Sequence, residues 1–186
     1  MAQVEVNDVG DMVLTEAAAM RALADPIRLA LVDRLTRHGT ASIDELAAHA
    51  GIDADATQAH VEKLVEVGLV VADGDGWRAV GRGLFFEVPE SGTEETQAAA
   101  RALAGAMLLS YERLPRDWVE NTEPQLELKW ARAAGLFNAG MTVTADELNQ
   151  IQADLEIMLK PYLNRTEPPA DARRVRMLAY FLPSGT

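Results

Sequence analysis

The stretch from Ser42 to Trp77 reads SIDELAAHAGIDADATQAHVEKLVEVGLVVADGDGW, and it decides the fold. Its first part predicts a short helix. Ser42 and Glu45 have the spacing of a capping box, in which each side chain accepts a hydrogen bond from a backbone N–H that would otherwise be unpaired. Gly51 follows the last apolar position and predicts the end of this helix, since glycine readily adopts the left-handed conformation found there.

The same stretch then predicts a second helix and a hairpin. The second helix spans residues 54–67, with Asp53 as its N-cap and Gly68 at its end. The run Asp73-Gly74-Asp75-Gly76 is typical of a tight turn between two antiparallel strands. Two short helices followed by a hairpin are the helix-turn-helix and the wing of a winged helix-turn-helix domain.

The residues before this stretch extend the pattern. An Ala-rich helix is predicted over 15–23, and Asp25-Pro26 then starts another that ends near Gly39. Together the motifs resemble the ArsR family of bacterial winged-helix regulators. The matching segments are Leu23-Ala24-Asp25-Pro26-Ile27-Arg28-Leu29, Ile43-Asp44-Glu45-Leu46-Ala47, His60-Val61-Glu62-Lys63-Leu64 and Val67-Gly68-Leu69-Val70. The resemblance implies a homodimer that binds an inverted-repeat operator in double-stranded DNA, usually as a repressor.

The second helix of the pair is the one expected to enter the major groove. The side chains that could donate to DNA are Thr57, Gln58, His60 and Lys63 on this helix and Arg78 on the wing. The segment departs from the family pattern, because Ala59 stands where the family usually has Arg and Glu62 where it usually has Lys.

The charge of this region opposes DNA binding. The chain has a formal charge of −12, and residues 21–80 hold six basic and ten acidic side chains. Phosphate neutralisation supplies much of the affinity of proteins for DNA, so a basic footprint is the usual sign of a DNA-binding surface. An alternative interpretation is therefore a winged-helix module that has lost DNA binding and docks a basic protein partner.

The second half predicts another domain. Residues 88–93 form a short Pro/Ser/Gly stretch that is typical of a linker. We therefore place a winged helix-turn-helix domain at 14–90, after an N-terminal extension at 1–13, and a dimerisation or ligand-sensing domain at 91–186. A long helix at 94–114, ended by Pro115, is either a dimer interface or an ordinary core helix.

A second capping box at Thr144 and Glu147 starts a helix, and residues 173–182 alternate like a strand. The fold class is thus mainly α with small β, a winged helix-turn-helix followed by a C-terminal α/β lobe. This lobe could bind a small-molecule effector in an apolar pocket, which would be lined by Trp118, Trp130, Phe137, Met141 and Tyr180. A basic cluster is formed by Arg173, Arg174 and Arg176. It could hold an acidic ligand, contact DNA or form a solvated strand face.

Other function classes lack their motifs. The chain has no cysteine, and its three histidines, His38, His49 and His60, have no paired metal-ligand spacing, so we expect neither a metal site nor a cofactor. No catalytic constellation or phosphate-binding loop is evident, which predicts that the chain is not an enzyme. No signal peptide or membrane span is recognisable, and we expect a cytoplasmic protein.

Overall fold

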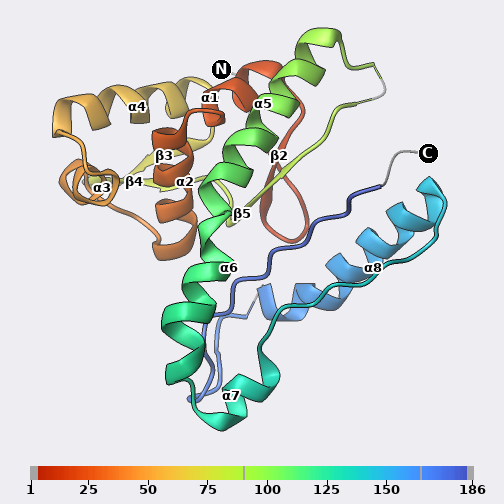
Figure 1. Cartoon of the computed structure of the whole chain (residues 1–186). Helices are drawn as coiled ribbons and strands as arrows, with labels where there is room; N and C mark the ends of the chain where they lie inside the picture. The colour runs from red at the N-terminus through yellow and green to blue at the C-terminus, as the bar shows by residue number, and fades with distance from the viewer. Residues whose placement is uncertain (1–3, 90, 164, 184–186) are drawn as a thin grey trace. The chain divides into compact units, whose positions relative to one another are not determined.

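The computed structural model describes residues 4–89, 91–163 and 165–183, and its contacts divide the chain into two compact units, residues 1–143 and residues 144–186. Figure 1 shows the order of the elements along the chain. The division lies more than fifty residues beyond the boundary that the Pro/Ser/Gly stretch suggests, because the helix that follows this stretch packs on the N-terminal helices.

Four helices form the centre of the first unit, and their ends follow the sequence signals. They are α1 (Ala17–Leu23), α2 (Pro26–His38), α3 (Ile43–Ala50) and α4 (Ala54–Glu66). Asp25 caps α2 by accepting a hydrogen bond from the Arg28 backbone N–H at 3.0 Å, and Pro26 occupies the first turn, where its missing N–H costs nothing.

The caps predicted for α3 and α4 are confirmed. The Ser42 N–H donates to Glu45 Oε2 at 2.8 Å, and the Glu45 N–H donates back to Ser42 Oγ at 3.3 Å. Gly51 ends α3 with a φ of 69°, which an L side chain rarely adopts. Asp53 caps α4 by accepting from the Ala56 N–H at 2.8 Å. The helix-turn-helix therefore has firmly defined ends.

The predicted hairpin consists of β3 (Val70–Asp73) and β4 (Gly76–Ala79), paired antiparallel with Val70 opposite Ala79. Ala41 and Trp77 form an antiparallel bridge through two backbone hydrogen bonds, of 2.8 and 3.0 Å. This bridge connects the hairpin to the residues just before α3, so the hairpin is fixed relative to the helices.

Residues 5–14, which fall largely in the N-terminal extension expected at 1–13, contain two strands of a small sheet. Strand β2 (Asp11–Leu14) pairs antiparallel with β1 (Glu5–Val6) and parallel with β5 (Gly83–Phe86). Met12 and Leu14 are buried in the main core. A strand of four residues is too short to give a clear periodic signal, and its partner lies about seventy residues away in sequence.

Helix α5 (Glu94–Tyr111) packs against α1 and α2. Ala99, Leu103 and Ala106 recur at helical spacing and are buried in the same core as the helix-turn-helix. On other sides of the helix Leu108 and Leu109 remain exposed. The sequence left α5 as either a dimer interface or an ordinary core helix, and its role as a core helix is confirmed. A dimer contact would have to use its exposed side.

Pro115 does not end the helical run as the sequence suggested. After α5 come α6 (Arg113–Asp117), a π-helical turn at Trp118–Thr122, a 3-10 turn at Glu123–Gln125 and α7 (Leu128–Ala133). Pro115 lies in the first turn of α6, where backbone N–H groups have no partner within that helix, so the proline is tolerated.

The second unit contains α8 (Ala145–Leu163), which begins at the predicted capping box of Thr144 and Glu147. Residues 173–182 form no strand, so the expected α/β lobe is wrong in this respect. Alternation of apolar residues supports a strand only where a neighbouring strand can pair with it, and residues 91–163 and 165–183 contain none. Among the described residues no helix is long and apolar enough to cross a membrane.

Candidate nucleic-acid interface

Helix α4 places one face in the core and the other at the surface. Thr57, Val61 and Leu64 are buried. The opposite side is exposed and carries Asp55, Glu62 and Glu66. Asp55 and Glu62 are about two helical turns apart, and Glu62 and Glu66 about one turn. This exposed side is the one that would face a major groove in a helix-turn-helix.

Thr57, one of the five candidate DNA-contacting residues, lies on the buried side of α4. Its side chain is 0% exposed, and its hydroxyl donates to the Asp53 carbonyl oxygen at 2.8 Å. The reason is its position, since Thr57, Val61 and Leu64 recur at the spacing of a single helix face. Thr57 therefore stabilises the first turn of α4 from inside.

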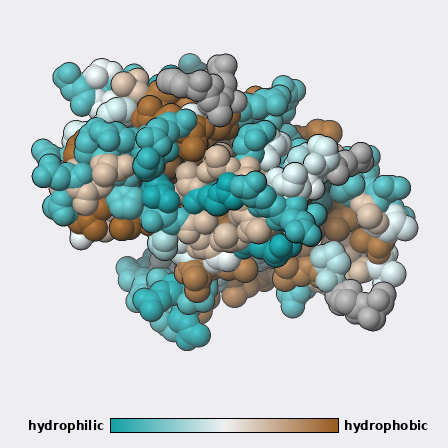
Figure 2. All heavy atoms as spheres, turned by 90° about the horizontal axis from the view of Figure 1, so that it is seen from above, coloured by the Kyte–Doolittle hydropathy of each residue, from teal (hydrophilic) through white to brown (hydrophobic). Residues whose placement is uncertain are grey.

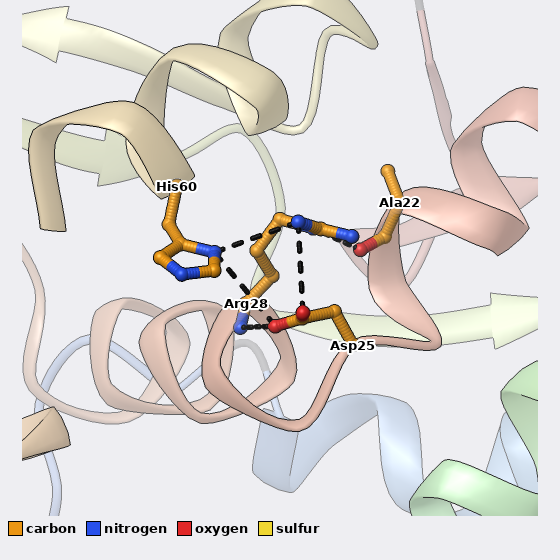
Figure 3. A network of polar contacts seen from close by, with 4 residues as sticks. All are labelled: Ala22, Asp25, Arg28 and His60. Carbon is orange, nitrogen blue, oxygen red and sulfur yellow. Dashed lines mark hydrogen bonds and ion pairs between the residues drawn. The ribbon is translucent and has the colours of Figure 1, made fainter. Parts of the chain in front are cut away.

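His60 points toward the start of α2 rather than outward (Figure 3). Its Nδ1 lies 3.5 Å from a guanidinium nitrogen of Arg28 and 3.8 Å from Asp25 Oδ1. Arg28 also lies 3.7 Å from the Asp25 carboxylate and donates through Nε to the Ala22 carbonyl oxygen. We call Asp25, Arg28 and His60 the α2–α4 network. The sequence identified Asp25 as a cap and Arg28 as part of a motif, but not their contact with His60.

Gln58 and Lys63 lie at the surface of α4, and both contact carboxylates of the same helix. Gln58 Nε2 donates to Glu62 Oε1 at 2.9 Å. Lys63 Nζ lies 2.9 and 3.0 Å from the two oxygens of Glu66. Both pairs are solvent-exposed and worth well under 1 kcal/mol, so either side chain can leave its partner for another ligand.

Carboxylates dominate the outer side of the helix-turn-helix. Figure 2 looks down on the molecule from above, and hydrophilic residues cover much of its left side, where α4 lies. We call Asp55, Glu62 and Glu66 the acidic stripe of α4. Only Lys63 adds a positive charge to the exposed part of this helix. Bare DNA would therefore meet net negative charge at the helix expected to read it.

The start of α3 adds to this negative charge. The backbone N–H and then the hydroxyl of Ser42 donate to the Glu45 carboxylate, and Arg34 adds a weaker attraction; together they lower the pKa of Glu45. Glu45 therefore stays ionised at neutral pH, and Asp44 beside it is also exposed. Both carboxylates complement the positive end of the α3 dipole.

Arg78 is exposed on β4, where one of its guanidinium nitrogens makes a long contact of 3.4 Å to the Ala79 carbonyl oxygen. The tip of the hairpin carries Asp73 and Asp75, and Asp73 accepts a hydrogen bond from the Thr40 hydroxyl. Among the five candidate residues, Gln58, Lys63 and Arg78 remain accessible, while Thr57 and His60 face inward.

The proposed pocket residues are not gathered into an enclosed site. Phe137 is 93% exposed and Met141 is 55% exposed, whereas Trp118 and Trp130 are half-buried. Tyr180 belongs to the other unit. A surface hollow of the first unit is lined instead by charged residues at α6, namely Glu112, Arg113, Arg116 and Asp117. Within residues 4–89, 91–163 and 165–183 no three His, Asp or Glu side chains are grouped to hold a metal ion.

Comparison with known proteins agrees with this geometry. Residues 23–71 match the family model of a helix-turn-helix domain, which covers α2, α3, α4 and the start of β3. No curated protein matches the chain. One solved structure, the apo form of the S-adenosylmethionine-dependent methyltransferase SibL, is similar over 79% of this chain and 43% of its own length. Its identity of 16% and TM-score of 0.32 are too low to carry any argument.

Proposed function

We propose that this chain, whose residues 23–71 form a helix-turn-helix domain, is a metal-independent, non-enzymatic transcription regulator of the ArsR-like type. It binds double-stranded DNA as a homodimer and represses transcription. The observation that carries the proposal is the capped pair of helices α3 and α4, with one side of α4 exposed and a hairpin directly behind it. The helix-turn-helix match suggests DNA binding and regulation; dimerisation and repression rest on the resemblance to ArsR proteins.

In this proposal α4 enters the major groove and the β3–β4 hairpin acts as the wing at the phosphate backbone. Gln58 leaves Glu62 to contact a base edge, and an amide side chain suits the paired donor and acceptor of adenine. Lys63 and Arg78 neutralise phosphates. Because few cations are available, each protomer releases few counterions, and the dependence of affinity on salt is shallow.

The experiment is fluorescence anisotropy of the full chain with labelled duplexes from the DNA upstream of its own gene, between low and moderate salt. Lys63→Ala and Arg78→Ala should each weaken binding to all sequences and reduce the slope of log K against log salt by about 1. Arg101→Ala, an exposed position on α5, is the matched control and should change neither quantity. Absence of binding to every upstream duplex at low salt overturns the proposal.

A second candidate function is favoured by the acidic stripe. In it, α4 and the hairpin tip dock a basic polypeptide instead of DNA, because a negative face attracts a positive partner and repels phosphate. Effector binding in the second half has no comparable support, since Phe137 and Met141 are largely exposed.

The variant Glu62→Lys separates the two functions. If α4 faces DNA, removing a carboxylate and adding a cation tightens DNA binding, and the added lysine steepens the slope of log K against log salt by about 1. If α4 faces a basic polypeptide, the same change weakens binding of a ten-residue oligolysine in a calorimetric titration. Glu120→Lys, on the π-helical turn outside the helix-turn-helix, is the charge-matched control.

A further inference from the structure

The second unit, residues 144–186, lacks a core of its own. None of its described side chains is buried: Leu148, Ile151, Leu155 and Leu159 on one side of α8 are only half-buried. The large apolar side chains that remain exposed are Ile157, Met158, Tyr162, Leu163, Val175, Met177, Tyr180 and Leu182. Hydrophobic burial is the main favourable term in folding, so a unit in this state needs a further surface to cover it.

Units of about this size that lack a core are stabilised by disulfides, by metal ions or by association. The chain has no cysteine, and its described residues hold no metal-binding group. Association is the device that remains.

The charges of the unit identify the associating partner. Helix α8 carries Asp146, Glu147, Asp154 and Glu156 against the single Lys160, whereas residues 165–183 carry Arg165, Arg173, Arg174 and Arg176 against Glu167 and Asp171. On the helix, Asp154 and Glu156 flank the apolar side on opposite edges, as charged residues flank the seam of a coiled coil. The unit thus contains an acid-edged apolar helix and a basic segment that also carries exposed apolar residues.

We propose that this unit is a self-association surface in which α8 of one protomer covers residues 173–182 of a second copy, and the reverse. A two-fold interface must be self-complementary, because each contact occurs twice with the roles exchanged. An acidic helix and a basic segment on one unit satisfy this condition. Within a single copy, Met158 of α8 and Val175 and Met177 of the basic segment remain exposed. Contacts between the helix and the segment of one copy therefore do not bury all of their apolar side chains.

This inference rests on the homodimer of the proposed function and gives it an interface outside the helix-turn-helix domain. The same surface does not require DNA, and it can be tested in DNA-free solution.

The test uses two charge-reversal variants of the full chain. The helix variant is Asp154→Lys with Glu156→Lys, and the segment variant is Arg174→Glu with Arg176→Glu. Sedimentation velocity over a dilution series gives the dimer dissociation constant of each, and circular dichroism verifies that helix content is retained. Each variant alone should dissociate at about tenfold or more higher concentration than the wild type, because like charges then face each other twice.

An equimolar mixture of the two variants should recover the wild-type dissociation constant, since both contacts in the heterodimer again join opposite charges. The control, Glu120→Lys with Glu123→Lys in the first unit, should dimerise as the wild type does. A mixture no tighter than its components, or a wild type that stays monomeric at high micromolar concentration, overturns the inference.

The outcome is separable from that of the proposed function. A chain that dimerises with this pattern and binds no upstream DNA refutes the regulator proposal alone. A chain that binds upstream DNA while both charge-reversal variants dimerise normally refutes the interface alone.

Discussion

The imidazole Nδ1 of His60 lies 3.8 Å from Oδ1 of Asp25, although the two residues are 35 positions apart in the chain. Asp25 caps α2, and His60 lies in the middle of α4. Arg28 contacts both (Figure 3). Because all three side chains are at most about one-third exposed, their contacts stabilise the packing of α4 on α2 more than a surface pair would.

We expect His60→Ala to lower the free energy of unfolding by about 1 kcal/mol, the usual contribution of one hydrogen-bonded or ionic contact of this burial. Urea unfolding at neutral pH measures it, with the neighbouring Gln58→Ala, which removes only an exposed pair, as control. In a double-mutant cycle with Asp25→Ala, the two changes should be less than additive. Strict additivity would show that Asp25 acts only as a cap.

Thr57 provides a second test, because this candidate DNA-contacting residue is buried in the structure. Thr57→Val keeps the shape of the side chain but removes the hydroxyl that donates to the Asp53 carbonyl oxygen. We expect a loss of stability of about 1 kcal/mol and unchanged affinity for DNA. Anisotropy titrations at a temperature well below the unfolding midpoint measure the affinity. If Thr57→Val weakened DNA binding and left stability unchanged, Thr57 would act as a DNA contact and not as a core residue.

The N-terminal strand gives a third prediction. Met12 is fully buried in the main core, so Met12→Ala leaves a cavity and should lower stability by about 2–4 kcal/mol. Thermal or urea unfolding of the full chain reports this change. Val6→Ala, on the exposed strand β1, should cost much less. Equal and small effects of the two substitutions would mean that the N-terminal residues are dispensable.

Acid should weaken the capping box of α3. Two hydrogen bonds lower the pKa of Glu45 below that of an unfolded glutamate. The larger effect comes from the Ser42 backbone N–H and the smaller from the Ser42 hydroxyl. Ionised Glu45 therefore contributes stability above the unfolded pKa, and this contribution disappears as the pH falls through the lower folded pKa. We expect Glu45→Gln to destabilise at pH 7, and the destabilisation to shrink as the pH falls through the folded pKa.

Unfolding experiments on both proteins across this range measure the difference. The matched variant in the second unit is Glu147→Gln, because the backbone N–H and hydroxyl of Thr144 lower the pKa of Glu147 in the same way. A destabilisation by Glu45→Gln that stays constant from neutral to acid pH would contradict the role of the carboxylate charge.

Local signals in the sequence were sufficient for the helix-turn-helix. Asp25, Ser42 and Asp53 each satisfy backbone donors a few residues away, and Gly51 and Gly74 meet local conformational demands. Such interactions depend on neighbours in the sequence, so their spacing alone identifies them. The accessible candidates Gln58, Lys63 and Arg78 followed from the same reading.

Tertiary structure decided what depends on distant partners. Strand β2 gives little periodic signal, yet it forms because β5 pairs with it. Residues 173–182 alternate, yet they form no strand, and residues 91–163 and 165–183 contain no strand that could pair with them. Thr57 and His60 are polar residues on the expected DNA-binding helix, yet Thr57 is buried in the core and His60 contacts Asp25 at the start of α2. The sequence alone determined where the helices and the turn begin and end; the tertiary structure decided which of their side chains remain free to meet DNA, because burial is set by all the elements together.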